Sequence, residues 1–201
     1  MALKVAKITI FNTPIVTDLL RLVAWIMLKL SGWKKIGQAP DLDKYVLIGG
    51  PHTSNWDFVV MIPMVLLLRI RPYWLGKHTL FPWPLGWLMR WLGGVAVDRR
   101  SSHNLVEQAA QAFAQEEQLV LLITPEGTRG EEERWKTGFY HIAQLAQVPV
   151  VHGFLDYPNK EAGIDSVFHT TGDIEYDLPR LQAQYYTKQG LYKRKPPGSI
   201  E

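Results

Sequence analysis

The sequence predicts a single α/β domain, with helices flanking a mixed or mainly parallel sheet. Three observations lead to this prediction. Strand-like and helix-like patterns alternate at least four times along the chain, which is typical of the class. The chain has 201 residues, of which 47% are hydrophobic, so it is long enough for one well-buried domain and short for two. The continuous apolar run Leu119–Ile123 is typical of a central strand covered on both faces.

The composition excludes several classes of chemistry. The chain contains no cysteine, which rules out disulfides, thiolate nucleophiles and Cys-ligated zinc and favours a reducing compartment. Its net charge of +3 fits attraction to an anionic membrane surface or an acidic substrate, and is too small to indicate nucleic acid. No metal site is expected, because no metal-ligand spacing relates four of the histidines, His78, His103, His141 and His169.

The first expected helix, residues 14–30, is almost wholly apolar. Thr13 is a suitable N-cap for it, and Pro14 suits its first position. Its polar side chains share one narrow stripe with Trp25; they are Asp18, Arg21 and Lys29. Such a helix is either buried on both sides or lies partly in lipid. Its charge-free apolar runs are too short for an ordinary transmembrane helix, and the N-terminus does not resemble a cleavable signal peptide.

The stretch at residues 45–57, YVLIGGPHTSNWD, combines a strand with two titratable side chains. Its apolar start predicts a strand at residues 45–49, and His52 and Asp57 follow. Residues five apart do not face each other on a helix, so the two side chains meet only if His52 precedes the helix and Asp57 lies in its first turn. Three suitable N-caps lie between them, Thr53, Ser54 and Asn55. Ligands of open α/β sheets bind beyond the carboxyl ends of the strands, where this pair would lie.

Residues 71–93 are the most aromatic part of the chain. We expect a strand at residues 73–75 and a short helix at residues 84–92. Tryptophan recurs here every four residues, next to two cations; these residues are Trp83, Trp87, Trp91, Lys77 and Arg90. A face of indole rings beside cations suits the membrane–water interface. The same rings could instead fill a core.

The remaining elements follow from shorter patterns. A helix at residues 55–69 carries an apolar run that suits burial, and Pro63 is expected to kink it. Further helices are expected at residues 104–115, from Gly138 to Gln147 and near 177–187, and further strands at residues 94–98, 119–123 and from 148 onward. Residues 164–171 complete the domain, and the polar, proline-rich tail at 193–201 is expected to be loose.

Three of the expected strands end in polar, titratable side chains. The three groups are His52 with Asp57, Asp98 with Arg99 and Arg100, and Glu126 with Arg129. If these strand ends are neighbours, one pocket holds a base, a supporting carboxylate and at least two guanidinium groups. Arginine forks match phosphate well, so Arg99 and Arg129 are candidates to bind a phosphate.

A histidine supported by an aspartate is the base half of a serine-hydrolase triad. The nucleophile is missing, since the chain has no G-x-S-x-G elbow and no cysteine. Such a pair suits removal of a proton from a substrate hydroxyl or amine, which then attacks an activated acyl group. Backbone N–H groups at the helix start could support the oxyanion. Taken alone, His52 and Asp57 would also fit a hydrogen-bonded turn histidine and a helix-start carboxylate.

Four short blocks, taken in order, resemble the glycerolipid acyltransferase family, best known for the 1-acyl-sn-glycerol-3-phosphate (lysophosphatidic acid) acyltransferases. The blocks are HTSNWD at 52–57, GGVAVDR at 93–99, PEGTR at 125–129 and VPVV at 148–151. The resemblance implies a glycerolphosphate-acyltransferase-like domain over residues 1–201, with its motif-bearing core at residues 45–155 and a membrane-associating helix at residues 14–30. Two positions depart from the family pattern: Thr124 stands in place of a common Phe, and His152 in place of a second Pro.

The resemblance also implies an activity and a set of site residues. A fatty acyl group would pass from acyl-CoA or acyl-carrier protein to the hydroxyl of a lysophospholipid, with His52 as the base, Asp57 as its partner and no cofactor. The residues implied in binding the acceptor are Gly93, Arg99, Glu126, Gly127, Thr128 and Arg129, with Lys77 and Lys136 as further candidates. The implied partners are these substrates and a membrane surface, at the cytoplasmic face of the cell membrane, and not nucleic acid.

Other functions stay open at this point. The chain could be a thioesterase-like hydrolase in which His52 activates water, or a non-catalytic peripheral membrane module that binds anionic lipid headgroups. The acceptor could also be another lysolipid or a hydroxyl-bearing amino-acid lipid. His152 could act as a second base in the pocket, or be a strand histidine whose hydrogen bonds are satisfied.

Overall fold

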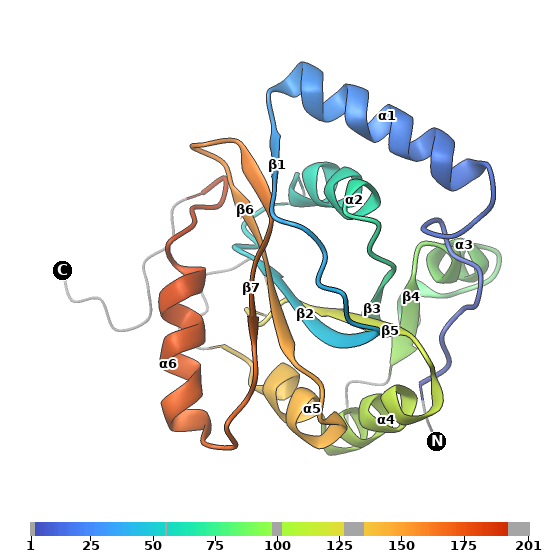
Figure 1. Ribbon diagram of the computed structural model, residues 1–201. Helices are drawn as coiled ribbons and strands as arrows, with labels where there is room; N and C mark the ends of the chain where they lie inside the picture. The colour runs from blue at the N-terminus through green and yellow to red at the C-terminus, as the bar shows by residue number, and fades with distance from the viewer. Residues whose placement is uncertain (1–2, 55, 98–101, 127–134, 193–201) are drawn as a thin grey trace.

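The computed structural model of the chain describes residues 3–54, 56–97, 102–126 and 135–192. Within them, one seven-stranded sheet has the order β1-β7-β6-β2-β5-β3-β4, with helices on both faces (Figure 1). Neighbouring strands pair in parallel, except β6 and β7, which are antiparallel. The predicted α/β domain with a mixed, mainly parallel sheet is therefore confirmed.

The bounds of the elements agree with the predicted ones in part. The strands are β1 (Lys34–Ile36), β2 (Lys44–Gly50), β3 (Pro72–Lys77), β4 (Gly94–Val97), β5 (Leu119–Ile123), β6 (Val150–Asp156) and β7 (Glu161–Phe168). The helices are α1 (Val16–Ser31), α2 (Asp57–Leu67), the 3-10 helix η1 (His78–Leu80), α3 (Leu85–Trp91), α4 (Ser102–Gln115), α5 (Gly138–Ala146) and α6 (Ile174–Tyr185). Helix α6 begins earlier than predicted because the Asp173 carboxylate accepts the first N–H groups of the helix.

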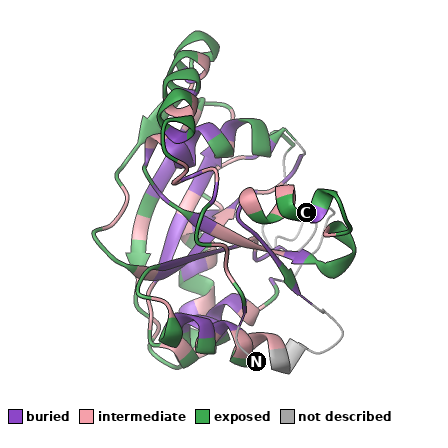
Figure 2. Ribbon diagram, turned by 90° about the vertical axis from the view of Figure 1, so that its right-hand side faces the viewer, coloured by how far each residue is buried: buried purple, intermediate pink, exposed green. Residues whose placement is uncertain are grey.

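Alternation along β2 divides the core into two layers. Tyr45 and Leu47 belong to the layer under α1 and α2, whereas Val46 and Ile48 belong to the layer under α4, α5 and α6. The strands in the middle of the sheet are mostly buried (Figure 2). Because β2 lies between β6 and β5, the loop that follows it leaves from the middle of the carboxyl edge of the sheet.

Helix α1 begins later than predicted and is buried on one side only. Thr13 Oγ1 donates to Thr9 O in a preceding turn, so Thr13 does not cap the helix, and Ile15 occupies the N-cap position. The side of α1 that includes Ala24 and Leu28 packs toward α2. Large apolar side chains are exposed on its other side; they are Ile15, Val16, Leu19, Leu22, Val23, Ile26 and Leu30. Burial on both sides, one of the two alternatives for this helix, is thus excluded.

The predicted face of three indole rings is present only in part. Trp83 and Trp87 are 93% and 66% exposed, before and within α3. Trp91 instead lies against the segment before α1: its Nε1 donates to Thr13 Oγ1 at 2.9 Å, and its carbonyl accepts the N–H of Ile10. These contacts place α3 near the start of α1. No described helix has both the length and the hydrophobicity that a membrane crossing requires.

Helix α2 begins at Asp57 rather than at residue 55, with Trp56 at the N-cap position and no side-chain cap. The prediction of Thr53 or Ser54 as the N-cap is therefore wrong, and Asn55 lies outside the described residues. The backbone N–H groups of Thr53 and Ser54 donate to the Asp57 carboxylate instead. The helix start is thus organised by a carboxylate in its first turn rather than by a hydroxyl before it.

Candidate active site

The carboxyl edge of the sheet brings together the ends of β2 and β5. These strands are parallel neighbours in which Ile48 pairs with Ile123, so the segments that follow them leave the sheet close together. One segment carries His52 and the other carries Glu126. Two of the three polar strand ends predicted to meet are therefore in contact. The third, at residues 98–100, lies outside the described residues.

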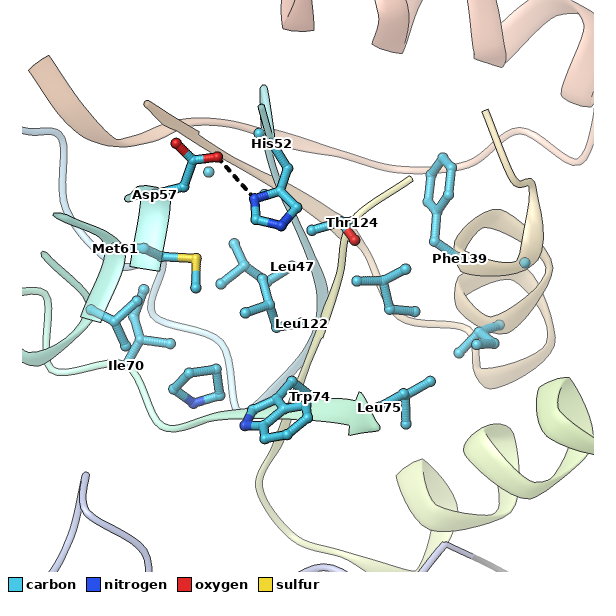
Figure 3. A pocket seen from close by; sticks show the side chains of 18 of the residues that line it. Leu47, His52, Asp57, Met61, Ile70, Trp74, Leu75, Leu122, Thr124 and Phe139 are labelled. Carbon is cyan, nitrogen blue, oxygen red and sulfur yellow. Dashed lines mark hydrogen bonds and ion pairs between the residues drawn. The ribbon is translucent and has the colours of Figure 1, made fainter. Parts of the chain in front are cut away.

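His52 and Asp57 form a hydrogen-bonded pair at this edge (Figure 3). His52 Nδ1 lies 2.9 Å from Asp57 Oδ2, with His52 before α2 and Asp57 as its first residue, which is the arrangement that their spacing predicted. An ionised carboxylate only accepts hydrogen bonds, so Nδ1 carries the proton and Nε2 is the nitrogen that can take one up. The pair thus contains an imidazole whose tautomer is set by its neighbour.

Asp57 also closes the loop between the two residues. Its Oδ2 accepts the backbone N–H groups of Thr53 and Ser54 at 2.8 and 2.9 Å, and the residue is only 1% exposed. Burial by itself raises the pKa of this carboxyl. Hydrogen bonds from His52, the Ser54 N–H, Tyr157 and the Thr53 N–H outweigh that effect and hold the pKa below its usual value. Asp57 is therefore ionised at neutral pH.

Tyr157 is a residue of this site that no sequence pattern identified. Its hydroxyl donates to Asp57 Oδ1 at 2.8 Å. Burial, together with the hydrogen bond and charge of Asp57, raises the pKa of Tyr157, so the phenol keeps its proton. The residue directly follows β6 and stands 100 positions after Asp57, so no local spacing could have linked the two.

Glu126 is buried beside the pair. It is 1% exposed, and its Oε2 accepts the backbone N–H of His52 at 3.1 Å. Because Glu126 follows β5 and His52 follows β2, this hydrogen bond joins the segments that follow two neighbouring strands and holds the backbone of His52 in place. The role of Glu126 in binding an acceptor stays a prediction.

A largely apolar cavity of about 1550 Å³ adjoins the pair. In Figure 3, His52 lies close to Leu47 and Leu122, and Met61 borders the same space. Leu47 comes from β2, Leu122 from β5 and Met61 from α2. Trp74 lies at the opposite end of the view from His52. The titratable pair therefore borders a space whose lining is mostly apolar.

The structure places the other predicted site residues differently. Gly93 has a φ of +84°, and a Cβ there would lie 2.5 Å from Pro72 O, so the backbone itself requires glycine. Lys136 lines the cavity, whereas Lys77 is exposed at the end of β3. Arg99, Gly127, Thr128 and Arg129 lie outside the described residues. Among the described residues, no cluster of three or more His, Asp and Glu side chains could hold a metal ion.

His152 lies in the core and does not line the cavity. It is 2% exposed in β6, and its ring stacks on that of Tyr185 with centroids 5.4 Å apart. Its Nδ1 lies 3.5 Å from Asp165 Oδ2. Burial lowers the pKa of His152 to about 4, against the opposing effect of Asp165. The structure thus favours a strand histidine over a second base in the pocket. Within the part of the chain that the structure describes, however, neither ring nitrogen has a hydrogen-bond partner, so the expectation that its hydrogen bonds are satisfied is wrong.

Acidification is expected to destabilise the fold through His152. Its pKa rises from about 4 in the folded protein to the ordinary 6.5 in the unfolded chain, so the unfolded chain binds a proton first as the pH falls. The free energy of unfolding is therefore undiminished by this histidine above about pH 6.5, and it falls progressively as the pH drops toward 4. Between about pH 7 and about pH 5 the loss should be about 2 kcal/mol, measured by denaturant unfolding.

The variant His152→Leu removes this titration. Between about pH 7 and about pH 5, its free energy of unfolding should fall by about 2 kcal/mol less than that of the parent. His169→Leu is the matched control, because His169 is exposed, and it should keep the parent's pH dependence. Equal pH dependence in the parent and in His152→Leu would show that another group is responsible.

Comparison with known proteins identifies a family and a similar fold. A family model described as Acyltransferase matches residues 34–152. A similar solved structure is that of the 1-acyl-sn-glycerophosphate (LPA) acyltransferase PlsC from Thermotoga maritima, with a TM-score of 0.58 and 16% identity over 86% of this chain and 77% of that chain. At this identity the likeness shows a shared fold. No curated protein sequence shows significant similarity to the chain.

Proposed function

Because the chain belongs to the acyltransferase family, we propose that it transfers a fatty acyl group to the hydroxyl of a lysophospholipid. The observation that carries this proposal is the 2.9 Å hydrogen bond between His52 Nδ1 and Asp57 Oδ2, next to an apolar cavity. The proposed acceptor is 1-acyl-sn-glycerol 3-phosphate, in keeping with the name of the similar solved enzyme. The proposed donor is acyl-CoA or acyl-carrier protein.

The proposed reaction needs no protein nucleophile. His52 Nε2 takes the proton of the acceptor hydroxyl while that oxygen attacks the carbonyl carbon of the thioester. The tetrahedral intermediate then collapses, the carbon–sulfur bond breaks, and the imidazolium returns the proton to the departing thiolate. Asp57 stays ionised and stabilises the imidazolium between these steps. The products are an ester and a free thiol.

The cavity is the proposed site of an acyl chain. Leucine side chains from two strands and the flexible Met61 offer the apolar surface that a fatty acyl chain requires. An acyl chain lying there could bring its carbonyl end to His52, which borders the same space.

Acceptor-dependent thiol release tests this function. Purified protein should release CoA from palmitoyl-CoA when 1-acyl-sn-glycerol 3-phosphate is added, and only slowly without it. Equal release with and without an acceptor would favour the thioesterase-like alternative, in which His52 activates water. Absence of turnover with both palmitoyl-CoA and palmitoyl acyl-carrier protein, together with binding to vesicles, would favour the non-catalytic lipid-binding module.

The protein is further proposed to act at a membrane surface, on the cytoplasmic face. The support is an apolar surface formed by the exposed side chains of α1 and by the segment around α3, which lie near each other; from the latter it includes Trp83, Leu85 and Trp87. Lys29 stands over the Trp25 ring and Arg90 over the Phe81 ring, so cations border the exposed apolar groups. Indole rings and cations together suit the headgroup region of an anionic bilayer.

Replacing Trp83 and Trp87 together by alanine should weaken vesicle binding by at least about tenfold, because burial of even one such aromatic side chain contributes about 1.5–3 kcal/mol. Cosedimentation with vesicles of phosphatidylcholine and phosphatidylglycerol measures the effect. Tyr176→Ala is the control, since Tyr176 is an exposed aromatic residue on α6, away from α1 and α3 (Figure 1). Unchanged binding of the double variant would argue against this membrane surface.

A further inference from the structure

The two oxygens of Asp57 have different sets of partners. Oδ2 accepts from His52 Nδ1 and from the backbone N–H groups of Thr53 and Ser54. Oδ1 accepts from the Tyr157 hydroxyl at 2.8 Å. The first three donors belong to the loop before α2, whereas Tyr157 comes from the turn between β6 and β7. The carboxylate is therefore held from two separate parts of the fold.

Tyr157 is itself held in place. Its ring meets the Trp33 ring edge to face, with centroids 5.0 Å apart and an interplanar angle of 87°. Its backbone N–H donates to Gln189 O at 2.9 Å, and its carbonyl accepts the N–H of Lys160 at 3.2 Å. Because ring and backbone are both fixed, the hydroxyl reaches Asp57 from a preorganised position.

We propose that Tyr157 is a positioning residue for the His52–Asp57 pair, whose hydroxyl holds the Asp57 carboxylate in the rotation that presents Oδ2 to His52 Nδ1. The terminal torsion of an aspartate is broad and roughly two-fold, so a fixed partner on Oδ1 narrows its range. The same hydrogen bond favours the ionised carboxylate over the neutral acid. Tyr157 acts through Asp57, and its effect on turnover rests on the function proposed above.

The variant Tyr157→Phe keeps the ring and removes only the hydroxyl. We expect kcat for acyl transfer to fall about tenfold while KM values stay close to those of the parent. Tm should fall slightly, because Oδ1 of the buried carboxylate loses its hydrogen-bond donor. Tyr176→Phe is the matched control, because Tyr176 is exposed on α6, and it should change none of these quantities. If the parent transfers acyl groups, a kcat of Tyr157→Phe equal to the parent's would overturn the proposal.

The proton on His52 Nδ1 provides a second readout, which does not depend on turnover. Proton NMR of the free protein should show it at low field, and its loss in His52→Ala assigns it. The resonance should shift in Tyr157→Phe and stay in place in Tyr176→Phe; an unchanged resonance in Tyr157→Phe would overturn the proposal. If the resonance shifts but the parent transfers no acyl group, Tyr157 still positions the pair and it is the proposed function that fails.

Discussion

Replacing His52 by alanine is expected to reduce kcat for acyl transfer by about 10²–10⁴-fold, the usual contribution of a general base. Its Nδ1 donates to Asp57, so Nε2 is the nitrogen that takes the acceptor's proton, and alanine offers no substitute. The imidazole borders the cavity, and Asp57 keeps its backbone partners without it. The fold and vesicle binding should therefore survive. Steady-state assays at saturating donor and acceptor measure the loss.

His169→Ala is the matched control for this variant. His169 is exposed after β7 and does not line the cavity, so its removal should leave kcat unchanged. The two variants thus separate loss of one particular imidazole from loss of any histidine. If His52→Ala keeps kcat within about twofold of the parent's, the assignment of His52 as the general base is wrong.

A second large loss of kcat, about 10²-fold or more, is expected for Asp57→Asn. The backbone N–H groups of Thr53 and Ser54 should hold the amide oxygen where Oδ2 now lies, so the loop keeps its shape. What disappears is the negative charge that stabilises the His52 imidazolium during transfer. The KM values should stay near those of the parent, because the loss is confined to the transition state.

Asp57→Ala separates this electrostatic effect from folding. It leaves two backbone N–H groups and the Tyr157 hydroxyl without their acceptor in a buried site, at a cost of about 1–3 kcal/mol for each. Thermal unfolding followed by circular dichroism should show a lower Tm for Asp57→Ala and a nearly unchanged Tm for Asp57→Asn. Parent-like kcat in Asp57→Asn would mean that the charge of the carboxylate is not used.

Local patterns were sufficient for the class of fold and for the arrangement of the pair. A parallel strand buried on both faces needs a continuous apolar run, and the strand predicted at residues 119–123 coincides with β5. Helical geometry prevents residues five apart from facing each other, so contact between His52 and Asp57 required a loop followed by a helix start. The structure has that arrangement, with Asp57 as the first residue of α2.

Contacts between distant segments could not be predicted in this way. Tyr157 reaches Asp57 across 100 positions only because β6 lies next to β2 in the sheet. Strand β1 carries no periodic signal, because its three residues are all exposed. The start of α1 was misplaced because Thr13, a good N-cap by residue type, is already hydrogen-bonded to Thr9 in the preceding turn.

The most direct test of the central claim is to follow an isotope-labelled acyl group by mass spectrometry. The claim is that His52 and Asp57 activate a lysophospholipid hydroxyl for attack on an acyl thioester. Incubation of the purified protein with labelled acyl-CoA and 1-acyl-sn-glycerol 3-phosphate should place the label in a diacyl glycerophosphate, and His52→Ala should form almost none. Label found only in free fatty acid, or an equal yield of diacyl product from His52→Ala, would contradict the claim.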